Sequence, residues 1–308
     1  MLSKSETLLA HLNSAFMRLK LLNFRNYISS FYNYYKTYRN FAEVLMHIVL
    51  NRFPIEATLR NGQKVILKDH ATAYLYTKFK NLKINDLFIE FEYSGKIVRL
   101  YGLKHGDLSW KYGDLATIFI SRDYDILNVK DKVVIDIGAN VGDTPVYFAL
   151  RGARKVIAFE PFPYLFSLAK KNVEENGLQD RVILVNAGCG YDGKVRVRED
   201  VDPAVDIQLV DYGTGIEIPI YSLNSIVKMF NIENAVLKVD CEGCEYELFK
   251  GATNETLSKF EQIMIEYHYG YKELVKRLKE ANFKVKFTIP KFNKDTKMII
   301  GYIFAWRQ

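Results

Sequence analysis

The stretch "VVIDIGANVGD", Val133 to Asp143, decides the fold of this chain. Its first residues are apolar and β-branched, which is typical of a buried parallel strand. Gly138 and Gly142 then allow a tight turn and a close approach of backbone. The next residues, "TPVYFALRG", have the pattern of a helix with a proline in its first turn. A strand, a glycine loop and a helix in this order predict a site for a nucleotide-like ligand.

Asp136 stands at the mouth of that glycine loop. In a dinucleotide site a pyrophosphate docks here on free backbone N–H groups, and a carboxylate would repel it. The loop therefore argues against a diphosphate and favours a ligand with a positive charge.

Glu160 ends the next strand, in "VIAFEP", 24 residues after Asp136. An acid at this position accepts hydrogen bonds from ribose hydroxyls. S-adenosylmethionine fits both acids, because it has a ribose, no phosphate, an ammonium and a sulfonium. We expect Asp136 to hold the ammonium directly or through water, Gly138 and Gly142 to let the ligand lie against backbone, and Asn140 to orient the loop. The alternative is a structural strand end followed by a turn.

The chain divides into three zones. Residues 1–52 are helical in pattern and rich in aromatic residues, residues 53–120 contain short strands, and residues 121–308 alternate strands with helices. Hairpin signals lie at Asn61-Gly62 and Ser94-Gly95. The end, "FKVKFTI" and "MIIGYIFAWR", indicates an antiparallel hairpin. We therefore predict an α/β fold with a Rossmann-like sheet of seven strands, preceded by a helical and β-rich N-terminal extension.

The stretch "LKVDCEGCE" places Asp240 at the carboxyl end of a further strand, where open α/β sheets bind ligands. Glu242 and Glu245 follow at the start of a helix, where acids also stabilise the helix dipole by about 0.3–1 kcal/mol each. Both interpretations stay open for Glu245. For Asp240 we favour a position facing a reactive methyl group and an acceptor hydroxyl, because methyl transfer needs alignment and removal of the hydroxyl proton.

"VVIDIGANVGDTPVYFAL", "AFEPFPYLFSLAKKNVEENG" and "LKVDCEGCEYELFKG" resemble the FkbM-type methyltransferases, a class I branch of the Rossmann-like S-adenosylmethionine-dependent enzymes. The resemblance covers about residues 120–268. It implies transfer of a methyl group, mostly to hydroxyl oxygens of sugars or natural products. It implies that Asp136 and Glu160 hold the cofactor, and it places Asn186 in "VNAGCG" near the adenine.

His268 ends the strand "IMIEYH", with Glu266 on the same face two residues earlier. The resemblance extends to this acid-x-His ending. We predict Asp240, Glu266 and His268 as catalytic residues, with Asp240 or His268 as the base. The same three residues could hold a divalent ion such as magnesium, but we do not favour a metal.

Three cysteines are too few for a disulfide framework, so we interpret Cys241 and Cys244 as small packing residues in a reducing compartment. The N-terminus lacks an apolar core followed by a cleavage site, and no apolar run is long enough to span a bilayer. These features predict a cytoplasmic protein.

The net charge of +7 lies mostly in residues 1–52, which hold seven Lys/Arg against two Glu. This zone is expected to cap the catalytic domain with its aromatic residues buried. Peripheral contact with an anionic membrane and binding of nucleic acid are the alternatives, and the oligomeric state stays open.

The sequence as a whole predicts methyl transfer from S-adenosylmethionine to a hydroxyl of a small-molecule or glycan acceptor. The alternatives are methylation of an RNA nucleoside and a non-catalytic nucleoside-binding protein. Acceptor pockets are built from variable loops, so the acceptor itself is not specified.

Overall fold

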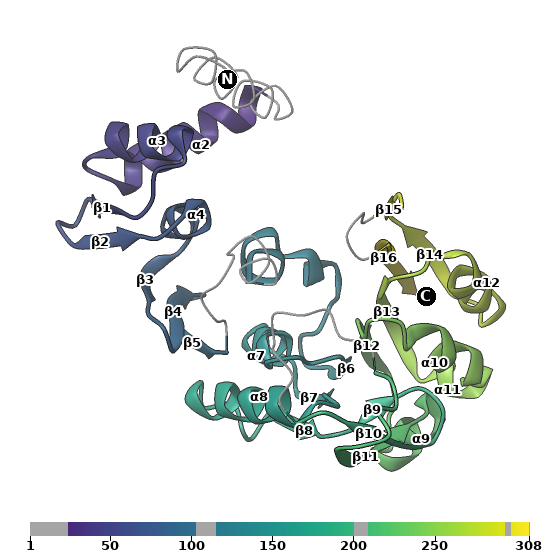
Figure 1. The fold of residues 1–308 in the computed structure, drawn as a ribbon. Helices are drawn as coiled ribbons and strands as arrows, with labels where there is room; N and C mark the ends of the chain where they lie inside the picture. Colours follow the sequence, from purple (N-terminus) through teal and green to yellow (C-terminus); the bar gives the residue numbers. More distant parts are fainter. Residues whose placement is uncertain (1–23, 103–114, 200–208, 293–296, 308) are drawn as a thin grey trace, which may run out of the picture. The chain divides into compact units, whose positions relative to one another are not determined.

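The computed structural model describes residues 24–102, 115–199, 209–292 and 297–307 (Figure 1). Contacts divide the chain into two compact units, Met1–Leu82 and Lys83–Gln308, and each unit is described by itself. The N-terminal part of the basic zone, residues 1–23, lies outside the described residues.

The described part of the first unit combines three helices with a β-hairpin. Its elements are α2 (Phe24–Thr37), α3 (Phe41–Leu50), β1 (Ile55–Thr58), β2 (Lys64–Leu67) and α4 (His70–Lys78). The two strands pair antiparallel across the turn at Asn61-Gly62, as predicted. One core cluster in the described part of the unit holds seven buried side chains: Tyr38, Val44, Ile55, Ala57, Val65, Leu67 and Ala73. The Tyr38 hydroxyl donates a hydrogen bond to the Ala73 carbonyl over 2.8 Å. Residues from the predicted zones 1–52 and 53–120 therefore share one core.

The aromatic residues of α2 and of the turn directly after it differ in their exposure. Tyr38, which directly follows this helix, is fully buried. Phe31, Tyr32 and Tyr35 are 53%, 51% and 47% exposed. The expectation that the aromatic residues of this zone are buried is therefore right for Tyr38 and wrong for these three side chains.

The second unit holds the large sheet. Strand β3 (Lys80–Ile84) contains the division between the units. The elements that follow are β4 (Phe88–Tyr93), β5 (Lys96–Tyr101), η1 (Ala116–Ser121), η2 (Asp123–Ile126), β6 (Val133–Ile137), α7 (Asp143–Leu150), β7 (Lys155–Phe159), α8 (Pro163–Glu175), β8 (Val182–Val185), β9 (Gly188–Cys189), β10 (Gly193–Val197), β11 (Ile216–Tyr221), α9 (Leu223–Met229), β12 (Ala235–Val239), α10 (Glu245–Gly251), α11 (Asn254–Ser258), β13 (Phe260–Tyr267), α12 (Lys272–Glu280), β14 (Lys284–Phe287), β15 (Lys291–Phe292) and β16 (Ile299–Trp306).

Seven strands of the large sheet run in the order β14-β16-β13-β12-β6-β7-β8, with β15 added beside β16. Strands β8, β7, β6, β12 and β13 are parallel, whereas β16 is antiparallel to both β13 and β14. The predicted Rossmann-like sheet and its terminal antiparallel hairpin are confirmed. The hairpin of β4 and β5 around Ser94-Gly95 is also confirmed. A second small sheet, β10-β11-β9, was not expected, because one of its strands has only two residues.

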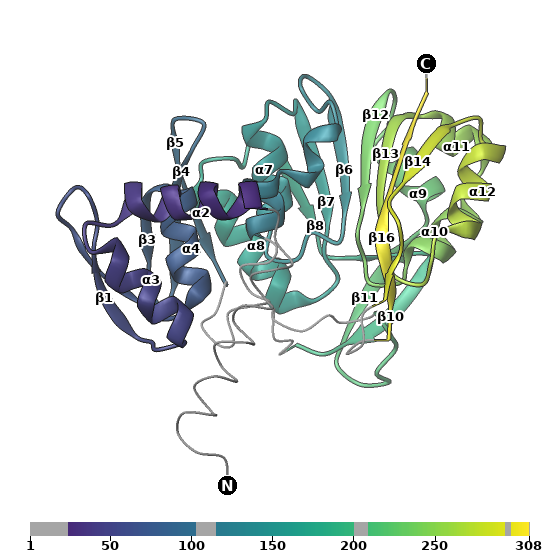
Figure 2. The same ribbon diagram turned by 90° about the horizontal axis from the view of Figure 1, so that it is seen from above.

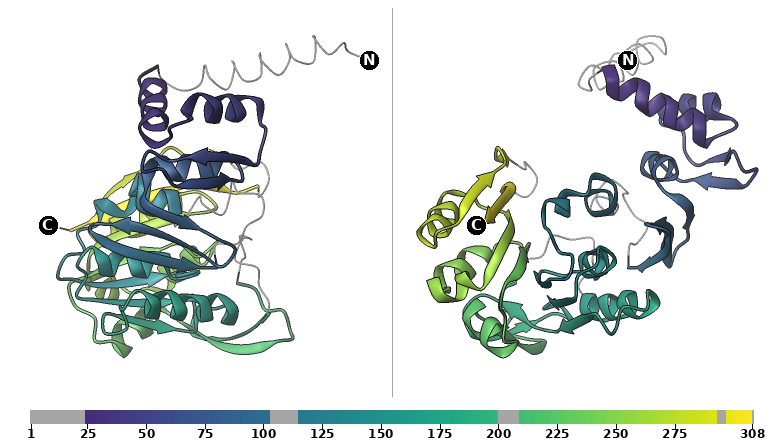
Figure 3. Two further views of the ribbon diagram at one scale, coloured as in Figure 1. Left: turned by 90° about the vertical axis from the view of Figure 1, so that its left-hand side faces the viewer. Right: turned by 180° about the vertical axis from the view of Figure 1, so that it is seen from behind.

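Helices cover both faces of the large sheet. Figure 2 shows α7 and α8 on one side of it and α9 to α12 on the other, and Figure 3 shows the same separation from behind. The buried side chains of alternate strand positions, such as Ile135, Leu237 and Ile263, pack against α9 to α12. Chain order reverses between β6 and β12, so a ligand crevice is expected at the carboxyl ends of these two strands.

Candidate active site

Asp136 on β6 lies directly beside Lys238 on β12 in the strand register. Both side chains are buried, and the Lys238 ammonium lies 3.1 Å from one Asp136 oxygen. The other oxygen accepts a hydrogen bond from the Thr144 hydroxyl over 2.6 Å. Lys238 also donates to the Gly138 carbonyl over 2.7 Å. The charge of Asp136 is therefore balanced inside the protein, and its predicted contact with a ligand ammonium stays a prediction.

Burial and neighbouring charges shift the pKa values of this cluster in opposite directions. Burial alone would lower the pKa of Lys238, but the carboxylates of Asp136 and Asp240 outweigh it and hold the pKa above its ordinary value. Burial raises the pKa of Asp136, against the attraction of Lys238. Burial also raises the pKa of Asp143, the second acid of the glycine loop, to about 6.

The two glycines of the loop serve the packing of protein backbone. At Gly138, with φ of +81°, an added Cβ would lie 1.7 Å from the Asp240 carbonyl oxygen. At Gly142, with φ of +84°, it would lie 2.8 Å from the Ala169 Cα on α8. Both glycines let the loop approach the β12 end and helix α8, and their predicted contact with a ligand stays a prediction.

Glu160 ties the end of β7 to the glycine loop. Its carboxylate accepts hydrogen bonds from the backbone N–H groups of Asn140, over 2.8 Å, and Phe162, over 3.0 Å. Burial raises the pKa of Glu160 to about 8, although these two bonds favour the charged form. The side-chain amide of Asn186 donates to the carbonyls of Glu160 and Pro161, each over 2.9 Å. The predicted residues Asn140, Glu160 and Asn186 therefore lie together at the carboxyl ends of β6, β7 and β8.

The side-chain oxygen of Asn140 is buried without a hydrogen-bond partner among the described residues. Asn140 has a left-handed backbone, with φ of +47°. A buried acceptor without a donor costs about 1–3 kcal/mol. The oxygen is thus suited to a donor from a ligand, and the loop fits a cofactor that carries an ammonium and ribose hydroxyls.

A second cluster of acids surrounds His268 at the carboxyl ends of β12 and β13. The buried Glu245 contacts His268 Nδ1 over 3.0 Å and accepts a hydrogen bond from the His268 backbone N–H over 3.0 Å. His268 Nε2 lies 3.3 Å from a Glu242 oxygen and 3.8 Å from an Asp240 oxygen. Asp240 and Glu242 are partly exposed, so the cluster is accessible from outside.

The acids determine the protonation of this histidine. Burial alone would lower the pKa of His268, but Glu242 and Glu245 outweigh it and raise the pKa to about 11. The two carboxylates therefore favour the protonated ring, and the role of His268 as the general base stays a prediction. Glu266 differs, because burial and the nearby Asp240 raise its pKa well above its ordinary value.

Sequence reasoning gave no role to Lys238 and underestimated Glu242 and Glu245. A signal for Lys238 existed, because it is a charge inside the apolar strand "AVLKV". Glu245 is more than a helix-terminus acid, since it is buried against His268. Glu242 has a positive φ of 55°, an uncommon backbone conformation that places its side chain beside His268.

Cys241 and Cys244 form a disulfide. Both residues pack against the core, as predicted, but as a disulfide-bonded pair and not as free thiols, because a separation of three residues in a turn brings the two sulfur atoms into bonding range. Cys189 is buried with a free thiol. The disulfide encloses Glu242 and Gly243, so it fixes the loop that carries part of the acidic cluster.

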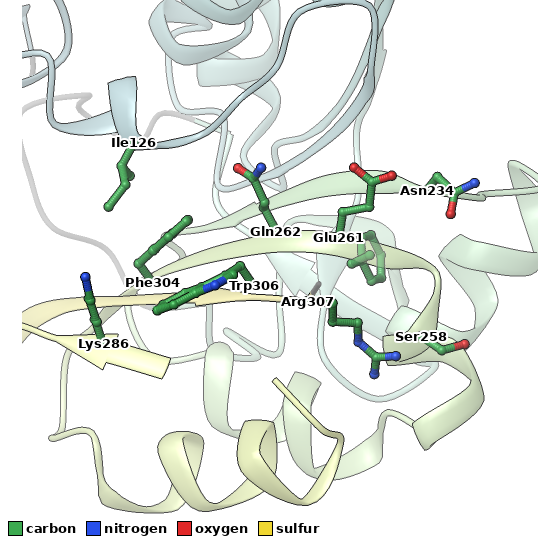
Figure 4. A pocket seen from close by; sticks show the side chains of 10 residues that line it. Ile126, Asn234, Ser258, Glu261, Gln262, Lys286, Phe304, Trp306 and Arg307 are labelled. Carbon is green, nitrogen blue, oxygen red and sulfur yellow. The ribbon is translucent and has the colours of Figure 1, made fainter. Parts of the chain in front are cut away.

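A separate cavity of about 820 Å³ lies at the opposite, amino ends of β12 and β13. Figure 4 shows Phe304 and Trp306 along its wall, and these rings stack with 5.2 Å between their centroids. The cavity contains none of the predicted site residues.

Among the residues that the structure describes, no helix has the length and apolarity needed to cross a membrane.

Comparisons with known proteins agree with this geometry. The methyltransferase FkbM domain matches residues 136–285, which include both clusters. Hexuronic acid methyltransferase AglP of Haloferax volcanii is 28% identical over 176 residues, which are 56% of this chain and 71% of that protein. Methyltransferase 1 of Beauveria bassiana is 23% identical over 174 residues, or 48% of this chain and 70% of that protein.

Among solved structures, M. jannaschii TYW2 in complex with AdoMet has a TM-score of 0.40 and 16% identity. The similar region covers 73% of this chain and 88% of that chain.

Proposed function

We propose that this chain, whose residues 136–285 match the methyltransferase FkbM domain, moves the methyl group of S-adenosylmethionine to a hydroxyl oxygen of a sugar or other small-molecule acceptor. The proposal depends chiefly on one observation. A glycine loop with an unsatisfied buried acceptor lies beside a cluster of carboxylates and a histidine, at the point where strand order reverses.

The cofactor, when bound, supplies an electrophilic methyl group on a sulfonium. The oxygen of Asn140 would accept a hydrogen bond from it, and the remaining lone pairs of Glu160 would accept bonds from its ribose. Asn186 holds the turn after β7 in place through its two hydrogen bonds. Asp240 lies close to the loop, because its backbone N–H donates to the Ile137 carbonyl over 3.0 Å.

The acceptor hydroxyl must be aligned with the methyl group and must lose its proton as the new bond forms. Glu266 is the base that we favour, because its carboxylate lies near the carboxyl end of β13, close to Asp240. Asp240 would orient the hydroxyl, and the His268 cation would balance the charge of the surrounding acids. The proton passes to Glu266, the C–O bond forms, and the C–S bond breaks to leave S-adenosylhomocysteine.

A sugar acceptor is supported by one similar protein, the hexuronic acid methyltransferase AglP of Haloferax volcanii. The similarity to that relative covers only part of this chain. The acceptor class is therefore best tested directly, with uronic acids and neutral sugars compared side by side.

The full chain should be incubated with methyl-labelled S-adenosylmethionine and a panel of glycosides, uronic acids and total RNA. We expect label in a glycoside or uronate product whose mass increases by one methyl substitution. Glu266→Gln should bind S-adenosylhomocysteine like the parent chain but lower turnover by about 10²–10⁴-fold. Salt-sensitive label in RNA would favour the RNA alternative. Cofactor binding without turnover across the panel would favour a non-catalytic protein.

A further inference from the structure

Three ligand atoms of suitable chemistry converge at the open side of the His268 cluster. His268 Nε2 and one carboxylate oxygen each from Asp240 and Glu242 lie within 4.8 Å of one another. Two atoms bound to one ion at about 2.1 Å, at angles of 90–109°, are separated by about 3.0–3.4 Å. The observed 3.3 Å from His268 to Glu242 falls in this range, and the 3.8 Å to Asp240 exceeds it by a few tenths of an ångström.

Buried residues outside the three fix two of these ligands. Glu245 contacts His268 Nδ1 over 3.0 Å, which directs Nε2 toward Asp240 and Glu242. Metal-binding histidines are commonly oriented by a carboxylate in this way. The second Asp240 oxygen lies 3.8 Å from the Lys238 ammonium, which leaves the first oxygen turned toward the histidine. His268, Glu245 and Lys238 are all at most 2% exposed, so this arrangement is built into the core.

From this geometry we propose that Asp240, Glu242 and His268 bind one divalent metal ion. The ion would displace the Nε2 proton of His268, because one neutral imidazole nitrogen and two carboxylates suit ions such as Mn²⁺. Asp240 and Glu242 retain 28% and 26% side-chain exposure, which leaves coordination positions for water or an acceptor. The sequence suggested Glu266 as a ligand beside Asp240 and His268. The structure instead brings Glu242 to the histidine and leaves Glu266 outside the group of three.

The role of the ion rests on the proposed function, whereas its binding does not. An ion here would hold the acceptor hydroxyl between Asp240 and Glu242 and lower the pKa of that hydroxyl. The released proton would pass to Glu266, as in the proposed reaction. Two neighbouring oxygens of a sugar would fit two open positions on the ion, so acceptors with adjacent hydroxyl or carboxylate oxygens are the expected class.

The test is a titration of the full chain with Mn²⁺ after treatment with a chelator. Binding is measured as the decrease in the electron paramagnetic resonance signal of the free ion. We expect one saturable site per chain. Glu242→Gln and His268→Ala should abolish it, and Glu245→Gln should weaken it by about 10–100-fold. Glu280→Gln is the matched control, because Glu280 is an exposed acid on α12 and should leave binding unchanged. Circular dichroism and S-adenosylhomocysteine binding should show that each variant is folded. If His268→Ala is unfolded, the partly exposed Glu242→Gln still decides.

Absence of a saturable Mn²⁺ site in the parent chain, or an equal site in Glu242→Gln, would overturn the inference. Turnover in the same samples separates the two proposals. Methyl transfer that persists at full rate in the presence of EDTA would refute the ion's role and retain the methyltransferase function. If Mn²⁺ binds at one saturable site but no methylated sugar is formed, the proposed metal site stands and the proposed sugar acceptor is refuted.

Discussion

At the scale of single residues, Lys238 has the widest consequences for the site. It is a full charge within an otherwise apolar strand, and it contacts Asp136, the glycine-loop backbone and the region of Asp240. A buried charge is tolerated only when paired, so Lys238 and Asp136 depend on each other. The same pair joins the glycine loop to the acidic cluster.

Lys238→Met should lower the free energy of unfolding by about 3–5 kcal/mol, because it leaves Asp136 buried without its partner. Urea denaturation measures the change. The double variant Lys238→Met/Asp136→Asn should recover part of the loss. Lys194→Met is the control, because Lys194 forms an exposed pair with Glu217 and its loss should leave the free energy of unfolding nearly unchanged. Equal losses in the two lysine variants would contradict the role of the buried pair.

His268 gives a pH dependence to the metal-free protein. Its folded pKa of about 11 lies above the ordinary value of 6.5, so its favourable contribution to stability is complete below pH 6.5. That contribution declines as pH rises toward 11. The difference in unfolding free energy between the parent chain and His268→Ala should therefore shrink from pH 6.5 to 9. A difference that grows over this range in denaturation experiments would show that the ring is not a buried cation.

At the scale of elements, the strand–loop–helix unit from β6 to α7 depends on backbone contacts that a Cβ would disrupt. Gly138→Ala should cost about 1–3 kcal/mol more than Gly177→Ala and should abolish cofactor binding. Both glycines have positive φ, but the space around Gly177 is open whereas Gly138 touches the Asp240 carbonyl. Thermal unfolding and calorimetry with S-adenosylhomocysteine measure the two effects. Similar losses in both variants would mean that backbone conformation alone accounts for the effect.

Most elements of the second unit could be predicted because each carries its own local signal. Apolar strands, the Ser94-Gly95 turn and the periodicity of α12 depend on residues close together in the chain. The partners of the acids could not be predicted in the same way. Asp136 meets Lys238, and Glu245 meets His268, only through strand order and register, and no local pattern encodes either pair. The disulfide was missed for a different reason, since cysteine number alone argued against it.

At the scale of the whole molecule, the division at Leu82 determines where the chain can be shortened. A chain that begins at Pro54 removes Tyr38 and Val44 from the core of the first unit, which exposes the apolar surface that they cover. We expect it to aggregate. A chain that begins at Lys80 keeps β3 whole and should retain S-adenosylhomocysteine binding. Gel filtration and calorimetry test both. A monodisperse chain from Pro54 alongside an aggregated chain from Lys80 would contradict the division.

The pairing of β6 with β12 also sets a time for the site during synthesis. Lys238 reaches the Gly138 carbonyl across a separation of 100 residues, and His268 lies further along the chain. When the ribosome has completed the glycine loop, Lys238, which pairs with Asp136, has therefore not yet been synthesised. The site can form only after β12 and β13 have left the exit tunnel, so the growing chain carries Asp136 uncompensated until more than a hundred further residues have been translated.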